Sequence, residues 1–150
     1  HPDIHFKHIG GEHDLQLAQR ARQTAAHYPQ YQFIGALSHA ATRREIQRAH
    51  VLVHTSIMEG GAHVLMEAIC SGVPVIASRI AGNIGMLGDD YAGLFEVGDA
   101  QGLATLLLKF KNEPSFASQL QKQCALRAPL FEPAHERSGL ITIIKNTLLA

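Results

Sequence analysis

Along this chain, short segments in which the apolar residues have the spacing of a β-strand alternate with segments in which they recur every three to four residues, as in a helix. Alternation predicts a β-strand at residues 4–9, and short, mostly apolar runs predict strands at residues 31–34, 51–54, 73–77 and 94–95. The stretches between them have helical spacing. Short strands that alternate with helices are typical of an α/β fold, and we expect a Rossmann-like, doubly wound parallel sheet.

Several of the predicted helices have clear boundaries. They cover residues 15–27, 101–110 and 115–127, with a last helix from Pro133 to the C-terminus. Proline is favoured in the first turn of a helix, which supports that last start. The chain has no internal repeat and no low-complexity linker, so we expect one domain that covers residues 1–150.

Two local signals predict less regular helices. Thr42 and Glu45 have the spacing of a capping box, which would start a short helix after the second strand. Glycines at positions 82, 85, 88 and 93 predict a loop-rich stretch with at most one helical turn, around residues 84–87.

The composition narrows the class of ligand. Thirteen basic residues balance thirteen acidic ones, and 46% of the 150 residues are hydrophobic. Without a basic tract, the sequence predicts binding to neither nucleic acid nor an anionic membrane surface, and a small neutral or locally anionic ligand is expected. No apolar run reaches the ~18 residues of a membrane span. The chain starts at His1 rather than Met, and we expect a fragment of a longer, cytoplasmic protein.

Cysteines and histidines do not have the spacing of a metal site. Cys70 and Cys124 lie in apolar helical contexts, which predicts buried, reduced thiols. Among the ten histidines, His5 and His8 differ by three positions and so face opposite sides of a strand. We therefore expect no bound metal and no cofactor.

The segment from Glu59 to Glu67 has the most informative chemistry. It reads Glu59-Gly60-Gly61-Ala62-His63-Val64-Leu65-Met66-Glu67 and joins the third predicted strand to a helix that ends at Gly72. Ligands of doubly wound sheets bind beyond the carboxyl ends of the strands, where this segment lies. The N–H groups of a helix N-terminus attract phosphate, and glycines let a ligand approach the backbone.

Two interpretations of the glutamates remain open on the residues alone. In the first, the amides of residues 60–65 bind a phosphate, Glu59 accepts hydrogen bonds from hydroxyl groups, and Glu67 accepts them from a vicinal diol. Hydroxyls on both sides of a phosphate describe a sugar nucleotide. In the second, Glu59 only interacts with the helix dipole and Glu67 is an ordinary exposed helix residue.

Further segments match a known family in order. They are Phe33-Ile34-Gly35, residues 49–56, the segment from Glu59 to Glu67, Gly72-Val73-Pro74-Val75-Ile76-Ala77 and Ala81-Gly82-Asn83. This order resembles the C-terminal, donor-binding domain of the retaining GT-B glycosyltransferases, the glycosyl transferase group 1 family. The resemblance covers about residues 4–110.

The resemblance implies a metal-independent transfer of a sugar from a nucleotide diphosphate donor, with retention of the anomeric configuration. It implies that Glu59 contacts donor-sugar hydroxyls and that Glu67 holds the ribose diol. Amides of Gly60, Gly61, Ala62 and His63 would bind the sugar and distal phosphate, with Val64 and Leu65 facing the phosphates. The strand end at residues 33–37, with Gly35, would lie near the base.

Departures from the family pattern are informative too. Where the family commonly has Glu-Gly-Phe-Gly-Leu, this chain has Glu59-Gly60-Gly61-Ala62-His63, and Gly85 replaces a usual acidic residue. These variants resemble a bacterial subgroup that includes selenosugar synthases. The family's diphosphate-binding Arg/Lys pair and its N-terminal domain fall upstream of residue 4, so we expect an N-terminal domain of the same protein as partner and no activity of the chain alone.

Two other functions fit the same sequence. A sugar-nucleotide epimerase would use the same diphosphate site but would need an acid and a base beside the sugar. A nucleotide-binding module would bind without turnover.

Overall fold

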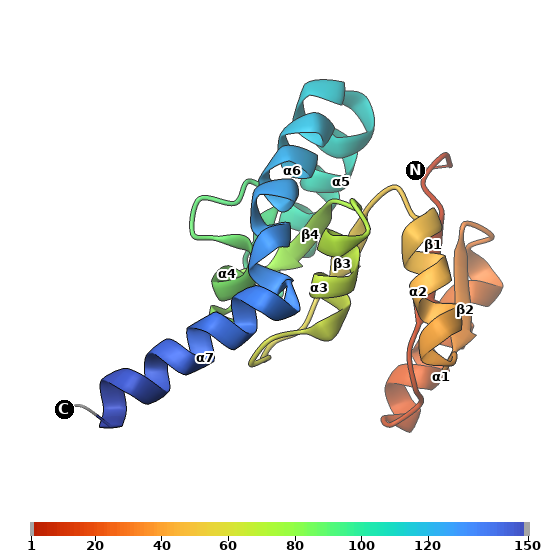
Figure 1. The fold of residues 1–150 in the computed structure, drawn as a ribbon. Helices are drawn as coiled ribbons and strands as arrows, with labels where there is room; N and C mark the ends of the chain where they lie inside the picture. The colour runs from red at the N-terminus through yellow and green to blue at the C-terminus, as the bar shows by residue number, and fades with distance from the viewer. Residues whose placement is uncertain (1, 149–150) are drawn as a thin grey trace. The chain divides into compact units, whose positions relative to one another are not determined.

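The computed structural model describes residues 2–148, except the side chain of Glu136, and divides into two compact units. Unit 1 covers the residues up to Glu45, and unit 2 covers the residues from Ile46 on. Figure 1 shows the helices and strands of both units along the chain. All strand pairs are parallel, and helices connect the strands. The predicted α/β class with parallel pairing is therefore confirmed, although the strands form a two-stranded and a three-stranded sheet.

Unit 1 contains the first two strands and the first helix. Its elements are β1 (Phe6–Ile9), α1 (Leu15–His27), β2 (Tyr31–Gly35) and most of α2 (His39–Arg48). The carboxylate of Asp14 accepts hydrogen bonds from the N–H groups of Gln16 (2.8 Å) and Leu17 (3.0 Å), which is why α1 starts at Leu15. The sequence predicted the bounds of α1 correctly.

The start of α2 corrects one expectation. Thr42 does not cap this helix but lies inside it, and its N–H donates to the carbonyl of Ser38 (2.9 Å). Ser38 lies at the N-terminal end, where its hydroxyl accepts a long hydrogen bond from the N–H of Ala41 (3.4 Å). Glu45 instead forms an ion pair with Lys7 (2.5 Å). The predicted capping box is wrong because Ser38, four residues before Thr42, lies at the N-terminus of the helix and because Glu45 pairs with Lys7.

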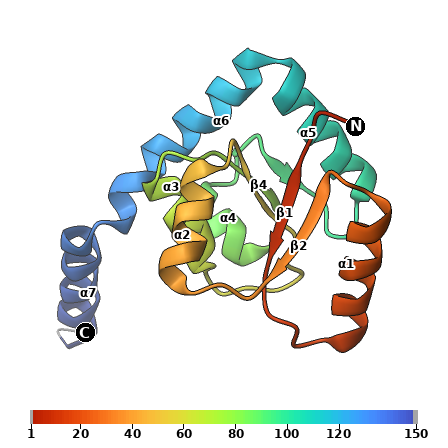
Figure 2. The same cartoon turned by 90° about the vertical axis from the view of Figure 1, so that its right-hand side faces the viewer.

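Unit 2 is built around a three-stranded parallel sheet in the order β3-β4-β5. Its elements are β3 (Leu52–His54), α3 (His63–Cys70), β4 (Val75–Ser78), α4 (Ala81–Leu87), β5 (Leu94–Phe95), α5 (Ala100–Asn112), α6 (Pro114–Arg127), the 3₁₀ helix η1 (Ala128–Phe131) and α7 (Pro133–Leu148). Every residue of the central strand β4 is buried. Figure 2 shows α5, α6 and α7 following one another along the outside of this unit.

Helix α3 ends at a glycine, as predicted. Gly72 has φ +73°, a backbone conformation that glycine adopts without steric cost. The N–H of Gly72 donates to Ile69 (3.1 Å) and that of Val73 to Ala68 (2.9 Å), the two bonds of a Schellman motif. The motif turns the chain toward β4, so the C-terminal end of this eight-residue helix is fixed next to the strand that follows it.

Helix α4 is longer than predicted. It covers seven residues and includes Gly82, although glycine weakens helices. A Cβ atom on Gly82 would lie 2.2 Å from the carbonyl oxygen of Glu59, so a side chain does not fit there. Arg127 of α6 donates hydrogen bonds to the carbonyls of Gly85 (2.8 Å) and Met86 (2.9 Å), near the C-terminal end of α4. Tertiary contacts therefore stabilise a helix that its local sequence disfavours.

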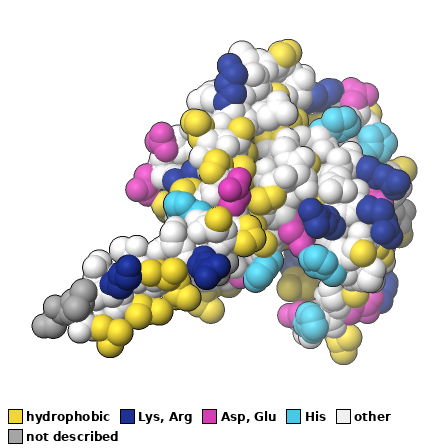
Figure 3. Space-filling view, in the orientation of Figure 1, with side chains coloured by type: hydrophobic (Ala, Val, Ile, Leu, Met, Phe, Trp, Pro, Cys, Tyr) yellow, Lys and Arg dark blue, Asp and Glu magenta, His cyan; other side chains and the backbone are white. Residues whose placement is uncertain are grey.

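The remaining expectations concern the cysteines and the last helix. Cys124 is buried as predicted, but Cys70 is exposed, because it lies on the outer side of the last turn of α3. Helix α7 starts at Pro133, as predicted, and its side chains from Leu140 to Leu148 include apolar residues that face solvent, visible as yellow atoms in Figure 3. No helix in the described part of the chain is long and apolar enough to cross a membrane.

Candidate functional site

The loop between β3 and α3 lies at the carboxyl edge of the sheet in unit 2. Strand register pairs His54 with Ala77 and Ser78 with Phe95, so all three strands end at this edge. The loop covers residues 55–62 and has no regular secondary structure. The polar side chains of the β3 and β4 ends and the N-terminus of α3 therefore meet in one place, as the sequence predicted for its Glu59 segment.

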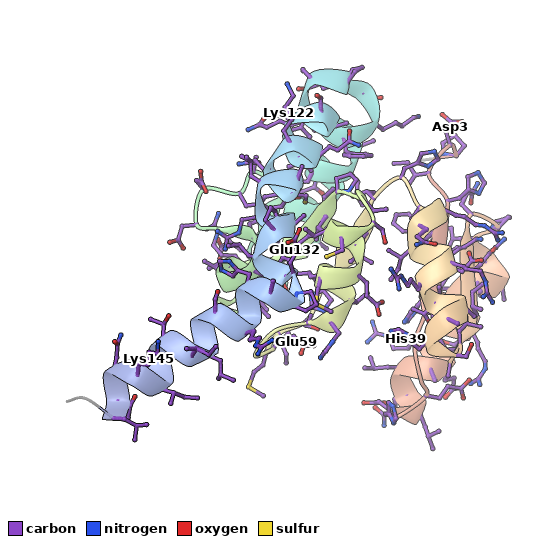
Figure 4. All side chains as sticks on the ribbon, viewed as in Figure 1. Asp3, His39, Glu59, Lys122, Glu132 and Lys145 are labelled. Carbon is purple, nitrogen blue, oxygen red and sulfur yellow. The ribbon has the colours of Figure 1, made fainter. Side chains whose placement is uncertain are left out.

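Glu59 is held by a hydroxyl group. Its carboxylate oxygen Oε1 accepts a hydrogen bond from Oγ of Ser56 (3.0 Å), and the same oxygen lies 3.8 Å from Nε2 of His54. The Ser56 hydroxyl also lies within hydrogen-bond distance of His54 Nε2 (3.2 Å). The Glu59 side chain is 38% exposed and that of His54 only 12%. Figure 4 shows Glu59 on the loop beside α3, far from Lys122 of α6.

Burial controls the protonation of His54. It lowers the pKa of the imidazole below its usual value, while the charge of Glu59 and the side chain of Asn83 act in the opposite direction. The net direction is downward, so His54 is neutral at pH 7. Its Nδ1 atom is buried and has no hydrogen-bond partner among the described residues.

Asn83 and Ser78 connect the loop to β4 and α4. The amide nitrogen of Asn83 donates to the carbonyl of Ser78 (2.8 Å), and the Ser78 hydroxyl donates to the carbonyl of Ser56. Both Asn83 and Ser78 are almost fully buried. Because a carbonyl accepts only, the Ser78 carbonyl fixes the orientation of the Asn83 amide, and Oδ1 faces the other way. Oδ1 is also buried without a partner among the described residues.

The glycines around the site differ in the space that a Cβ atom would have. Gly82 contacts the backbone of Glu59 so closely that a Cβ atom would overlap it. A Cβ on Gly60 would meet nothing within 4 Å, and one on Gly61 would meet only the sulfur of Met86 at 3.8 Å. Packing within the protein therefore requires glycine at position 82 but not at 60 or 61, whose lack of side chains leaves space beside the backbone.

The N-terminus of α3 has no side-chain cap. Ala62 occupies the capping position and has no polar side chain, so the first N–H groups of the helix depend on another acceptor. His63 is exposed and Val64 half-buried. The side chain of Leu65 is fully buried, and its N–H already donates to the carbonyl of Ala62 (2.9 Å). Of the predicted amide donors, that of Leu65 would reach a ligand only in competition with this bond.

Three further residues lie elsewhere on the elements: Glu67 and Gly35, which the sequence analysis named, and Arg79. Glu67 is half-buried on α3, four residues after His63 and thus on the same side of the helix. Arg79, which follows β4, forms an ion pair with Glu96 (3.1 Å). Gly35 ends β2 in unit 1, with φ +79° and its carbonyl bonded to the N–H of Gly10 (3.0 Å). No group of three or more potential metal-ligating side chains occurs among the described residues.

Sequence reasoning missed four side chains of this site: His54, Ser56, Ser78 and Asn83. In the sequence, His54 and Ser56 have the context of ordinary strand-end residues. The available signal was sequence spacing alone, since Ser56 follows His54 by two residues and precedes Glu59 by three. Nothing in the local sequence connects Asn83 to His54, which is 29 positions away.

Comparison with known proteins gives a consistent family. The family described as "Glycosyl transferases group 1" matches residues 1–127. A curated human protein, which is a subunit of phosphatidylinositol N-acetylglucosaminyltransferase, is 28% identical over 83 residues, which are 55% of this chain and 17% of that protein.

Solved structures have a similar fold. The HepE protein of Anabaena, in crystals with UDP and with UDP-glucose, matches 97% of this chain with a TM-score of 0.79 and 17% identity. A sucrose-phosphate synthase from Thermosynechococcus elongatus matches 95% with a TM-score of 0.73 and 22% identity. The chain spans 42% and 38% of those two chains, so it corresponds to less than half of each. The α/β fold with parallel sheets therefore matches part of the fold of GT-B glycosyltransferases.

Proposed function

We propose that this chain, which belongs to the glycosyl transferase group 1 family, is the donor-binding domain of an enzyme that transfers a sugar from a nucleotide diphosphate sugar to an acceptor. The proposal rests on two features that lie together: the carboxylate of Glu59, which accepts a hydrogen bond from the Ser56 hydroxyl, and the N-terminus of α3, which has no side-chain cap. An N-terminal domain of the same protein, outside this chain, would complete the acceptor side. The chain alone is then expected to be inactive.

Anion binding at α3 is the first part of the proposal. The helix N-terminus offers N–H groups and the positive end of the helix dipole. The space beside Gly60 and Gly61 lets a diphosphate approach these groups. The crystals of HepE with UDP and UDP-glucose support this choice of ligand by likeness of fold.

The two glutamates would bind opposite ends of the ligand. Glu59 would accept hydrogen bonds from donor-sugar hydroxyls, since a carboxylate beside the phosphates would be repelled by like charge. Glu67, on the His63 side of α3, would accept two hydrogen bonds from the ribose diol. The sugar and phosphates would be lined by Gly60, Gly61, Ala62, His63 and Val64.

Transfer with retention follows from the family resemblance, with Glu59 as the residue that contacts the reacting sugar. As the bond to the sugar breaks, negative charge grows on the leaving diphosphate. Preorganised N–H groups at α3 stabilise such charge without reorganisation, and the proposed reaction needs no metal for this purpose. The proposal includes the bacterial subgroup that includes selenosugar synthases, which Gly61, Ala62 and His63 resemble, and a cytoplasmic location, which fits a nucleotide-sugar donor.

The division of roles between the glutamates is tested in the full-length protein by calorimetric titration. Glu67→Gln should weaken binding of both the nucleoside diphosphate and the sugar nucleotide, by about 1.5–3 kcal/mol for hydrogen bonds to a charged group. Glu59→Gln should leave nucleoside diphosphate binding nearly unchanged while lowering turnover. Variants with unaltered melting temperatures are compared, so that a loss of about 0.3–1 kcal/mol in helix-dipole stabilisation is not mistaken for a lost contact.

The same titration decides between the candidate functions. A panel of nucleotide diphosphate sugars identifies the donor, and product analysis separates transfer with retention from epimerisation and from binding without turnover. Equal effects of the two glutamate variants on nucleoside diphosphate affinity would contradict the assigned roles.

Adding a chelator tests whether donor binding and turnover need a metal ion. Because helix N–H groups supply the positive potential, we expect EDTA to leave donor affinity and turnover of the full-length protein unchanged. Loss of binding that a divalent cation restores would show that a metal neutralises the diphosphate.

A further inference from the structure

We propose that His54 is a positioning residue for Glu59, acting through the Ser56 hydroxyl, and that it thereby orients the carboxylate toward the donor sugar. The inference rests on the proposed function for its consequence in catalysis, but its structural part concerns the ligand-free protein. Its basis is the chain of contacts from His54 Nε2 to Ser56 Oγ (3.2 Å) and from Ser56 Oγ to Glu59 Oε1 (3.0 Å).

The number of available protons determines which group donates and which accepts in this series of contacts. A serine hydroxyl has one proton to donate, and the ionised carboxylate of Glu59 can only accept. A hydrogen bond to a charged acceptor is stronger than one to a neutral ring nitrogen, so the Ser56 proton is directed at Glu59. The Ser56 oxygen must then accept from His54, which requires a proton on Nε2.

The unpaired atoms agree with this tautomer. With the proton on Nε2, Nδ1 of the neutral ring is an acceptor, and both Nδ1 and Oδ1 of Asn83 are buried without a hydrogen bond among the described residues. The opposite tautomer would place a proton on Nδ1 and offer Asn83 a donor, but it would turn the Ser56 proton from Glu59 to His54. Two buried atoms without a hydrogen bond between them are therefore what the proposed tautomer predicts, because it leaves both of them as acceptors.

The arrangement leaves one carboxylate oxygen for a ligand. Ser56 occupies Oε1 of Glu59, while Oε2 has no hydrogen-bond partner among the residues that the structure describes. The main chain of the loop is fixed as well, by the Ser78 hydroxyl at the carbonyl of Ser56 and by Gly82 against the carbonyl of Glu59. With backbone and one oxygen held, the direction of the second oxygen is set before a sugar binds, which reduces the cost of ordering it.

The first test uses the ligand-free protein and ¹⁵N NMR of its imidazoles, with the His54 signal identified by its loss in His54→Gln. We expect the Nε2-protonated tautomer in the wild type. In Ser56→Ala, Nε2 loses its acceptor while Asn83 Oδ1 remains available, so the tautomer should shift toward Nδ1 protonation. A wild-type ring protonated mainly on Nδ1, or no change in Ser56→Ala, would overturn the proposal.

The second test uses turnover of the full-length protein. His54→Gln keeps an N–H donor near the position of Nε2, whereas His54→Asn reaches only the position of Nδ1 and His54→Leu has no donor. We expect Gln to keep the turnover number within about threefold, and Asn and Leu to lower it about tenfold, the upper end of the range for a hydrogen bond between neutral groups. His50→Leu, at an exposed histidine outside the network, is the matched control and should have no effect.

A double-mutant cycle shows whether the effect passes through Ser56. If it does, His54→Leu combined with Ser56→Ala should lower turnover no further than either single change. The dissociation constant of the nucleoside diphosphate should stay unchanged throughout, since the network contacts the sugar end only. Additive losses, or weaker nucleoside diphosphate binding, would overturn the positioning role.

The experiments distinguish a failure of the proposed function from a failure of the positioning role of His54. If no nucleotide diphosphate sugar binds or reacts, the proposed function is wrong, and the NMR test still decides whether His54 holds Glu59 through Ser56. If transfer is observed and His54→Leu is fully active, the function stands and the positioning role does not.

Discussion

The two ends of strand β4 have polar clusters of opposite character. At the amino end, the hydroxyl of Tyr91 donates to the carbonyl of Val75 (2.6 Å), accepts from its N–H (3.2 Å) and contacts Sγ of Cys124 (3.3 Å). This hydroxyl uses its one proton and both its acceptor sites, and burial raises the pKa of Tyr91 and that of Cys124. At the carboxyl end, the cluster of His54, Ser56, Glu59 and Asn83 includes an exposed carboxylate and two buried polar atoms that have no hydrogen-bond partner among the described residues.

The difference separates structural from functional polar groups. A buried cluster with all its hydrogen bonds made fixes the packing of α6 and the loop before β5 against β4, and it has no capacity left for a ligand. A cluster with unused acceptors and partial exposure is less favourable for folding, and it is found at the strand ends where α/β sheets bind ligands. The contrast supports the proposal that the carboxyl end is the functional one, and it does so without reference to any relative.

The largest expected effect on stability is at the amino end. Tyr91→Phe removes the hydroxyl and leaves the N–H and carbonyl of Val75 without that partner in a buried place. We expect the free energy of unfolding to fall by about 2–4 kcal/mol, measured by urea denaturation, because each unsatisfied buried group costs about 1–3 kcal/mol. Donor affinity should not change.

Tyr28→Phe is the control for that substitution, because Tyr28 is 63% exposed. It should change stability by less than about 0.5 kcal/mol. If Tyr91→Phe were as mild as Tyr28→Phe, the amino-end cluster would not have the structural role assigned to it.

A pair of glycines in α4 tests the carboxyl end. In Gly82→Ala the new methyl group would overlap the Glu59 carbonyl, and we expect a loss of about 1–3 kcal/mol from overpacking, reduced by the better helix propensity of alanine. Sugar-nucleotide affinity should fall as well, since the Glu59 backbone must move. Calorimetry and denaturation of the same samples measure both.

Gly85→Ala is the matched control, three residues further along the same helix. A Cβ there meets nothing within 4 Å, so stability should rise by about 0.4–1 kcal/mol and binding should not change. Equal behaviour of the two alanine variants would mean that the contact of Gly82 with the loop is not needed.

The smallest expected effect is a pH dependence that belongs to the carboxyl end alone. The pKa of His54 is lower in the folded protein than in the unfolded chain, chiefly because of burial. The unfolded state therefore binds the proton more readily, and this histidine's contribution is complete above about pH 6.5 and is lost as the pH falls toward the folded pKa. Subtracting the unfolding free energies of His54→Gln from those of the wild type between pH 7.5 and 5 isolates the effect. A difference that grows as the pH falls would mean that the folded pKa is raised instead.

Local sequence was sufficient for elements whose signals lie within one turn of the chain. The Asp14 cap fixed the start of α1, Pro133 the start of α7, and Gly72 the end of α3. The glutamate and glycine pattern from Glu59 to Glu67 was enough to predict the position of the site on the sheet, because a strand, a glycine loop and a helix form a known type of anion site. The roles of these residues toward a ligand remain predictions.

Tertiary structure decided the points where a residue's partner is far away in sequence. Glycine at position 82 looked like a helix breaker, but it is required by the backbone of Glu59, 23 residues earlier. Thr42 and Glu45 matched a capping box, yet Lys7 pairs with Glu45. His54 looked like one histidine among ten until Ser56 and Asn83 were found beside it. Sequence by itself determined the class of fold and the position of the candidate site on the sheet, because periodicity and helix caps are local. Only the folded chain determined which polar groups are satisfied, because hydrogen bonding and close packing depend on partners that the sequence does not place side by side.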